Sequence, residues 1–236
     1  MTSSPEPPTL VWSKQPRAPR RQAPSVERIV RTAVDLADNE GLDAVSMRRI
    51  AAELASGTAS LYRYIASRDD LLDLMIDAVL GETGPPTLTG DWRADLGAVA
   101  RHLRATFIRH PWLSAELTGR PALGANSLRL QDLSLTAAGA LTTDITRAAA
   151  VVDTVQAYVF GAVAQQLADE RAQRRTGLTE DEWREAVAPY IREVIASGRY
   201  PEFGRRVRDA VDQDADHRFA FGLACVLDGI AAHAVD

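Results

Sequence analysis

The stretch from Ser46 to Arg68 constrains the fold most, because two apolar patterns of helical spacing flank a break only three residues long. Ser46 precedes the first pattern and can cap a helix there. Ala55-Ser56-Gly57 forms the break, and Gly57 is expected to supply a backbone conformation that other residues resist. The first pattern has apolar residues at steps of three and four, namely Met47, Ile50, Ala51 and Leu54. The stretch therefore predicts two short helices joined by a tight turn.

The second of these helices is predicted to run from about Thr58 to Tyr64, with Leu61 and Ile65 facing inward. Two short helices in this order form a helix-turn-helix, whose second helix fits the major groove of DNA. A plain helical hairpin inside an all-α bundle has the same apolar pattern. The outward groups, which are hydroxyls, phenols and guanidiniums that suit phosphate oxygens and base edges, favour DNA binding. These candidate DNA-binding residues are Ser46, Arg48, Thr58, Ser60, Tyr62, Arg63, Tyr64 and Arg68.

Residues 25–72 resemble the tetracycline-repressor (TetR) family of bacterial transcriptional regulators. The matching segments are Asn39-Glu40-Gly41-Leu42, Val45 to Ala51, Leu61 to Ile65 and Ser67 to Leu72. Two features depart from the family pattern. Its turn usually carries glycine and then an apolar residue where this chain has Ala55-Ser56, and its aromatic pair more often ends in histidine than in tyrosine, as at Tyr64. The resemblance implies a DNA-binding regulator, with Arg48 contacting a base and the hydroxyls holding phosphates.

The predicted fold is all-α with two domains: a three-helix DNA-binding domain at 25–70 and a larger helical bundle at 71–236. Residues 1–24 hold six of the twelve prolines and are expected to form a disordered arm. The arginines of that arm either lie along DNA or are solvated. The pattern shows no strand and no internal repeat. The expected helices cover about 25–39, 46–54, 58–64, 68–80, 91–109, 113–117, 126–138, 143–169, 179–195 and 216–234.

Charge is distributed unevenly along the chain, whose net charge is −5. Residues 14–68 carry ten basic and six acidic residues, so the excess of negative charge lies in the remainder. A basic end joined to an acidic body is expected when only one domain approaches phosphate. One cysteine, Cys225, excludes an internal disulfide framework and fits a reducing cytoplasm. No signal peptide or membrane-spanning segment is predicted.

The C-terminal part also resembles the ligand-binding and dimerising domain of one TetR subclass, through Arg109 to Leu113, Gly119-Arg120-Pro121, Gly198 to Pro201 and Phe219 to Leu223. In that family the last two long helices of two subunits form a four-helix bundle, which implies a homodimer. Small residues on the last helix would allow close approach of a partner helix, although a single subunit could use them for its own core. The expected interface residues are Val187, Ile191, Phe219, Leu223, Val226 and Ile230.

The sequence holds no phosphate-binding glycine loop, no Cys/His metal spacing and no nucleophile elbow, so neither a catalytic site, nor a cofactor, nor a metal site is predicted. The four histidines are expected to be solvated or hydrogen-bonded. A small-molecule cavity is expected in the larger domain, although each candidate could equally be plain core. These candidates are Phe107, Trp112, Asn126, Tyr158, Gln165 and Trp183.

The sequence therefore predicts a cytoplasmic homodimer that binds a palindromic operator, represses transcription and releases DNA when a small-molecule effector binds. Two alternatives remain: a ligand-binding helical protein without DNA binding, and an α-helical enzyme. The enzyme would need titratable residues clustered in an apolar pocket, and none is evident. The sequence does not identify the operator, the effector or the regulated genes. It also does not decide whether the protein represses or activates transcription, or whether the arm contacts DNA.

Overall fold

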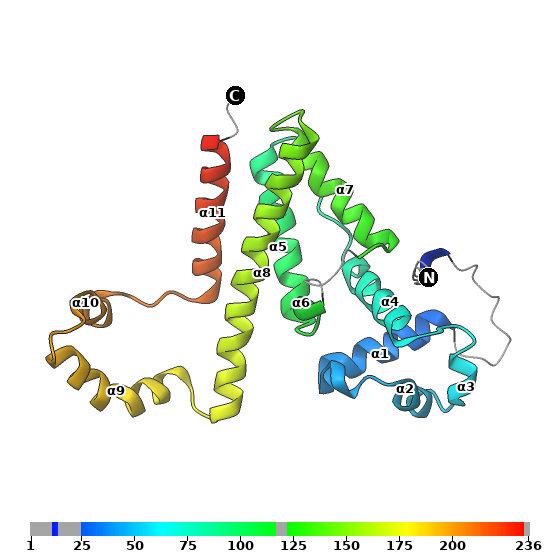
Figure 1. Ribbon diagram of the computed structural model, residues 1–236, viewed down its shortest axis with the longest axis horizontal. Coiled ribbons are helices and arrows are strands. Elements are labelled where there is room, and N and C mark those ends of the chain that lie inside the picture. The colour runs from blue at the N-terminus through cyan, green and yellow to red at the C-terminus, as the bar shows by residue number, and fades with distance from the viewer. Residues whose placement is uncertain (1–10, 14–24, 117–121, 234–236) are drawn as a thin grey trace, which may run out of the picture.

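The computed structural model describes residues 11–13, 25–116 and 122–233, and the regular elements within these ranges are all helical (Figure 1). The predicted all-α class is therefore confirmed. The elements are η1 (Val11–Ser13), α1 (Val26–Glu40), η2 (Leu42–Ala44), α2 (Met47–Glu53), α3 (Thr58–Leu61), α4 (Arg68–Gly81), α5 (Trp92–Arg109), α6 (Leu113–Glu116), α7 (Ala125–Gly139), α8 (Ile145–Thr176), α9 (Glu180–Ala196), α10 (Pro201–Asp209) and α11 (Ala215–His233).

Helices α1, α2 and α3 pack around buried apolar side chains that are continuous with the core of the rest of the chain. Ser25 caps α1 by accepting a hydrogen bond from the backbone N–H of Arg28, and Gly41 ends α1 at a φ of 89°. Ile29, Ile50 and Leu61, one from each helix, are completely buried. The apolar positions predicted for α1 and α2 thus face one another, as their helical spacing requires. This arrangement fixes the orientation of α2 and α3 relative to α1.

Helix α8 is the central helix of the larger domain. It packs against α5 and α7 on one side and α11 on the other, while α5 and α7 pack on each other (Figure 1). Gly222 permits the close approach of α11, because a Cβ there would lie 2.4 Å from the Tyr158 hydroxyl. That hydroxyl donates a 2.7 Å hydrogen bond to the carbonyl of Phe219. The length and composition of α8 would also suit a membrane span, but its buried residues pack inside this bundle.

Helix α4 is shared between the two halves of the chain, as predicted. It packs against α1 on one side and α7 on the other. Asp77 of α4 accepts hydrogen bonds from the backbone N–H groups of Asn126 and Ser127, and thereby caps α7. The side chain of Asn126 does not cap α7 but donates to the Asp77 carbonyl and carboxylate. The cap comes from a residue 49 positions earlier, so local pattern could not reveal it.

Other predicted boundaries also shift. Helix α3 ends at Leu61, and residues 62–64 form turns rather than the expected last helical turn. Asp144, not a threonine, caps α8. The expected polar connection at 170–177 is helical up to Thr176, because α8 continues until Gly177 adopts a left-handed φ of 68°. The predicted arm at 1–24 lies outside the described residues except for Val11–Ser13, a single turn beside α4 in which Val11 and Trp12 are half-buried.

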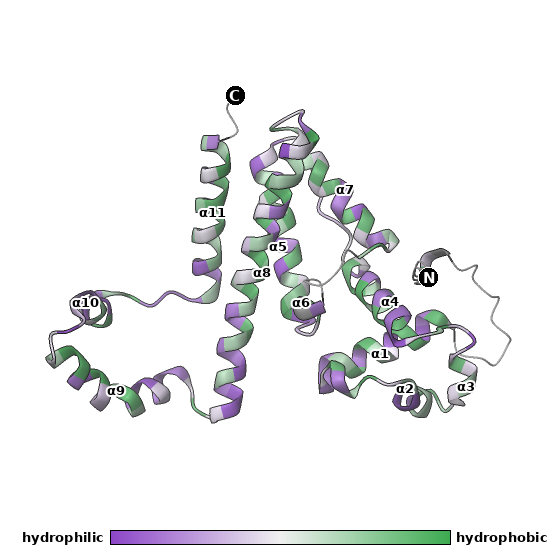
Figure 2. Ribbon diagram, viewed as in Figure 1, coloured by the Kyte–Doolittle hydropathy of each residue, from purple (hydrophilic) through white to green (hydrophobic). Residues whose placement is uncertain are grey.

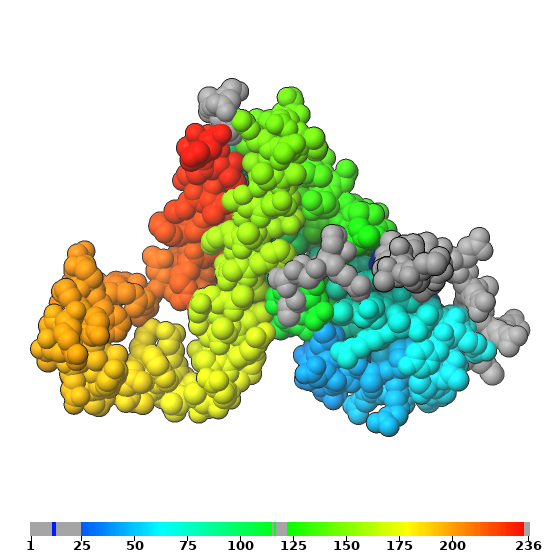
Figure 3. All heavy atoms as spheres, viewed as in Figure 1, coloured from blue at the N-terminus to red at the C-terminus, as the bar shows by residue number. Residues whose placement is uncertain are grey.

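Helices α9 and α10 form a projecting arm, defined here as residues 180–209, that stands away from the bundle (Figure 3). Helix α9 has no buried residue, and α10 buries only Gly204. Apolar residues nevertheless recur along both helices (Figure 2). A capping box formed by Thr179 and Glu182 begins α9. The projecting arm is therefore helical through local signals and not through a core of its own.

Candidate nucleic-acid interface

Two neighbouring arginines on α2 have opposite surroundings. Arg49 lies between two glutamates, with its guanidinium 2.9 Å from Glu40 and 3.1 Å from Glu53. Arg48 is exposed and has no hydrogen-bond or ion-pair partner among the described residues. Arg49 therefore stabilises the domain, whereas the cationic donors of Arg48 are available to a ligand. Ser46 caps α2 by accepting from the backbone N–H of Arg49 at 3.2 Å, so its hydroxyl also has a structural task.

The turn between α2 and α3 adopts its left-handed residue at Ala55, where φ is 48°. The expectation for Gly57 is wrong, because its φ of −80° is open to any residue. Ser56 closes the turn by donating its N–H to the Ala51 carbonyl at 2.8 Å. Ser60 bonds both the Gly57 carbonyl and the Ser56 hydroxyl, each at 2.7 Å. Ser60 thus fixes the start of α3 and is only half exposed.

The other candidates lie on or just after α3. Thr58 is half-buried at the first position of α3, and the preceding Gly57 supplies no side-chain cap. Tyr62 is 51% exposed, and Arg63 is exposed without a hydrogen-bond or ion-pair partner within the described part of the chain. Tyr64 packs half-buried against the core. Arg68 donates to the Leu42 carbonyl at 3.3 Å, which fastens α4 to η2.

The candidates therefore separate into two groups. Arg48, Tyr62 and Arg63 are exposed, and neither guanidinium has a hydrogen-bond or ion-pair partner within the described part of the chain. The remaining hydroxyl and guanidinium groups shape the turn or anchor neighbouring elements. Two unpaired guanidiniums beside a phenol suit phosphate oxygens and guanine edges. The surface offers no metal cluster within the described ranges and no titratable pair poised for catalysis.

The six residues predicted for the effector cavity do not meet in one place. Phe107 is fully buried and its ring centroid lies 5.3 Å from that of Phe160. Trp112 is buried and donates to Asp38 of α1 at 2.8 Å. Asn126 is bound to Asp77, as described above. Tyr158 is bound to α11, and burial raises the pKa of its phenol. Phe107 and Tyr158 are thus core residues of the subunit.

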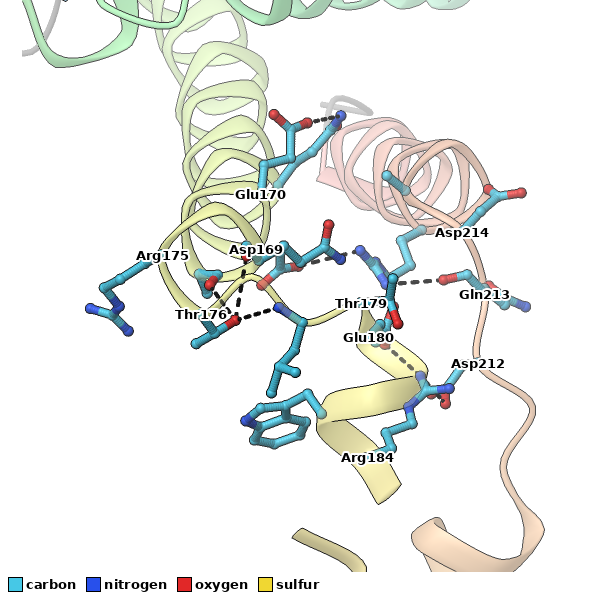
Figure 4. Close-up of a pocket in the computed structure, with 17 residues that line it drawn as sticks. Asp169, Glu170, Arg175, Thr176, Thr179, Glu180, Arg184, Asp212, Gln213 and Asp214 are labelled. Carbon is cyan, nitrogen blue, oxygen red and sulfur yellow. Dashed lines mark hydrogen bonds and ion pairs between the residues drawn. The ribbon is translucent and has the colours of Figure 1, made fainter. Parts of the chain in front are cut away.

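Gln165 and Trp183, the other two, lie near the lower end of α8. Gln165 is exposed and donates to Asp169, whereas Trp183 is 52% exposed. Trp183 lines a pocket of about 840 Å³ between the end of α8, the start of α9 and the segment before α11 (Figure 4). Ion pairs cross this pocket, with Arg184 at 2.7 Å from Asp212 and Arg218 at 3.6 Å from Asp169. Its lining therefore combines charged groups with apolar ones such as Trp183 and Leu178.

The residues predicted for the dimer interface also lie in different environments. Phe219 and Leu223 are buried within the subunit, and Val226 and Ile230 pack half-buried against the same core. These four side chains are therefore engaged inside one chain, because the apolar stripe of α11 turns toward α8. Val187 and Ile191 are half-buried on the projecting arm. The opposite faces of α8 and α11 expose small residues. The sequence had indicated this for the last helix, as at Ala224, but not for α8. These residues are Ala150, Ala157, Gly161, Ala164, Ala168, Ala220, Ala224 and Cys225.

Comparison with known proteins places both halves of the chain in one group. Residues 29–75 match the family model described as bacterial regulatory proteins of the tetR family. Residues 84–234 match the model described as the tetracyclin repressor-like C-terminal domain. Similar proteins include the HTH-type transcriptional repressor DrrR1 of Streptomyces coeruleorubidus, 41% identical over 94% of this chain and 83% of that protein. A class A tetracycline repressor from Escherichia coli is 28% identical over 86% of this chain and 88% of that protein.

Solved structures give the same result. ActR from Streptomyces coelicolor, in its complex with actinorhodin, superimposes with a TM-score of 0.74 at 31% identity, covering 93% of this chain and all of that one. The same protein in complex with (S)-DNPA gives a TM-score of 0.73 at 30% identity over 92% of this chain and 99% of that one. The likeness therefore extends across both domains and not only the helix-turn-helix.

Proposed function

Because the chain belongs to the TetR family of bacterial regulatory proteins, and is accordingly a DNA-binding transcriptional regulator and not an enzyme, we propose how it binds and releases its operator. The observation that carries the proposal is that the exposed guanidiniums of Arg48 and Arg63 have no hydrogen-bond or ion-pair partner among the described residues. In this proposal residues 25–70 read DNA and residues 71–236 bind the effector and a second subunit. The relatives that carry the name of repressor support repression as the output.

In this proposal Arg48 reads a base in the major groove, most naturally guanine. Arg63 contacts a base or a phosphate, and Tyr62 holds a phosphate. The half-exposed Thr58 and Tyr64 add phosphate contacts at the margin of the surface. Ser46, Ser60 and Arg68 act chiefly by shaping the surface, because their hydrogen bonds within the chain already engage them. Their free lone pairs or protons can still reach a phosphate.

A second subunit places two such surfaces on one duplex. The exposed small residues of α8 and α11 support a four-helix bundle with the same two helices of a partner, since alanine and glycine allow close helix approach. A twofold axis through that bundle would present two α3 helices to successive major grooves, about 34–36 Å apart. The operator is then an inverted repeat. The cytoplasm, where the DNA lies, is the proposed location.

Effector binding would lower the affinity for DNA by linkage. A molecule that binds more tightly to a conformation in which the two α3 helices do not match the spacing of the DNA grooves weakens operator binding. The loss of DNA affinity is set by the ratio of the molecule's affinities for the two conformations, typically about 5–150-fold. The ActR complexes support a small organic effector, because ActR binds actinorhodin and (S)-DNPA. In this chain α4 is the proposed lever, since it packs on α1 at one end and is held to α7 through Asp77 at the other.

The proposal is tested by selecting duplexes from a random DNA library with the full-length protein. We expect enrichment of an inverted repeat whose half-sites lie about one helical turn apart. A variant with Arg48→Ala should lose the preference at one base pair of each half-site. Enrichment of no sequence at all, by a folded protein, would refute operator binding. Actinorhodin can then be titrated against the selected duplex as a first effector probe.

A further inference from the structure

His110 is buried between two carboxylates from different helices. Its side chain is 3% exposed. Its Nδ1 lies 2.9 and 3.0 Å from the two carboxylate oxygens of Asp38 on α1, and its Nε2 lies 3.0 Å from Glu82 at the end of α4. The four residues His110, Asp38, Glu82 and Trp112 are called the corner cluster below. They join segments up to 74 residues apart in sequence.

Trp112 adds a second bond to the same carboxylate. Its indole Nε1 donates to Asp38 Oδ1 at 2.8 Å, and the rings of Trp112 and His110 meet edge to face. Both ring nitrogens of His110 are therefore engaged by carboxylates, one from α1 and one from the end of α4. Removing Asp38 takes the partner from the buried ring nitrogens of His110 and Trp112, which is costlier than losing an exposed pair. The corner cluster is therefore a rigid connection.

The corner cluster connects the larger domain to the DNA-binding domain. His110 follows the last turn of α5 and Trp112 precedes α6, so the cluster stands at the corner between two helices of the larger domain. Asp38 lies in the last turn of α1, which packs on α2, and α2 in turn packs on α3. A displacement of the α5–α6 corner is transmitted to α1 through Asp38 directly, without passing through the body of α4.

We propose that His110 and Trp112 are positioning residues that lock α1 to the α5–α6 corner, so that the DNA-binding domain follows this corner as one body. The proposal rests on the function proposed above for its consequence on DNA affinity, but its structural part stands alone. It predicts that the domain formed by residues 25–67 loosens when the corner cluster is broken, while α8 keeps its protection.

The test compares the full-length protein with His110→Ala, Asp38→Ala and the double variant, using amide hydrogen exchange. A matched control is His217→Ala, which breaks another His–Asp pair of 2.9 Å in an exposed position. We expect about tenfold faster exchange along α1 in each single variant, no further increase in the double variant, and no change in α8. Trp112→Phe, which keeps the ring and removes the donor, should give a smaller increase confined to α1.

Exchange in α1 that rises no more than in the control, or that rises equally in α1 and α8, would overturn the proposal. Trp112→Phe decides the matter if His110→Ala does not fold. The affinity for the selected duplex should fall in the same variants, about tenfold for each and without additivity in the double variant. A wild-type protein that binds no duplex would refute the proposed function, whereas the exchange result would still decide the corner cluster.

Discussion

The DNA-binding domain and the projecting arm are both short helical segments, yet they are stabilised in opposite ways. Residues 25–67 fold around completely buried side chains such as Ile29, Ile50 and Leu61. The arm at 180–209 has comparable helix length but buries only Gly204. Tyr190 of the arm is 67% exposed. Stability in the first region comes from tertiary packing and in the second from caps and surface ion pairs.

The two regions therefore differ in their contacts with the rest of the chain. The DNA-binding domain has buried side chains of its own and is joined to the rest of the chain by the packing of α1 on α4 and by the corner cluster. Its exposed residues Arg48 and Arg63 remain free to contact another molecule. The arm exposes an apolar surface that its own chain does not cover. Its exposed large apolar side chains are Trp183, Tyr190, Tyr200, Phe203 and Val207. Substitutions in the two regions should accordingly differ in size and in the property they change.

The largest expected effect is on the core of the DNA-binding domain. Leu61→Ala removes a completely buried side chain and should lower the free energy of unfolding by about 2–5 kcal/mol. Tyr190→Ala in the arm should change it by less than about 0.5 kcal/mol in a single subunit. Chemical denaturation of both variants measures the contrast. Equal losses would show that the arm has a core that the contacts do not reveal.

The next effect is on operator affinity, and it should distinguish an arginine with a free side chain from one held in ion pairs. Arg48→Ala should weaken operator binding by about 1–3 kcal/mol and relax one base position, because its guanidinium is free. Arg184→Ala in the arm, where Asp212 and Glu180 already engage the guanidinium, should leave affinity unchanged. Fluorescence anisotropy with the selected duplex checks both. An unchanged affinity and sequence preference for Arg48→Ala would remove this residue from the interface.

A substitution in the turn of the helix-turn-helix should stabilise the folded protein. Ala55 holds a left-handed φ of 48°, which glycine adopts at lower energy. Ala55→Gly should therefore raise the free energy of unfolding by about 0.5–1 kcal/mol, after the greater freedom of glycine in the unfolded chain is deducted. Gly57→Ala serves as the control, since its φ of −80° and open surroundings tolerate a Cβ. A destabilised Ala55→Gly variant would contradict the assigned turn.

The smallest effect concerns pH at two helix starts. Hydrogen bonds from Thr179 lower the pKa of Glu182 in the arm, and hydrogen bonding with Ser25 lowers that of Glu27 in α1. Each folded pKa lies below the unfolded one near 4.5, so the stabilisation is present above that pH and is lost as pH falls through the folded value. Amide exchange should therefore show the start of α9 fraying first on acidification, because α1 is also held by packing. Simultaneous fraying would contradict the comparison.

Local signals predicted the DNA-binding domain well. Ser25, Ser46 and Ser67 cap the helices they precede, and the apolar stripes of α1 and α2 face the core. Two of the failures share a cause, which is dependence on distant residues. Asp77 caps α7 from another helix, and the burial of Phe219 against α8 could not be distinguished from an interface position by spacing alone.

The candidate DNA-binding surface was predictable in location and less so in detail. Sequence pattern placed eight polar residues outward, but only contacts distinguish Arg48 from Arg49, which two glutamates neutralise. The left-handed turn residue was misassigned because glycine is the usual occupant and Gly57 is adjacent. The corner cluster has no local signature at all, since Asp38 and His110 lie 72 positions apart.

The most direct test of the account is a hydroxyl-radical footprint on the selected duplex, combined with the mass of the complex. The account predicts two protected patches on one face of the duplex, in successive major grooves about 34–36 Å apart, with two chains bound per site. It also predicts that Arg48→Ala weakens both patches together. A single patch, or two patches on opposite faces of the duplex, would contradict the proposed pairing of two α3 helices.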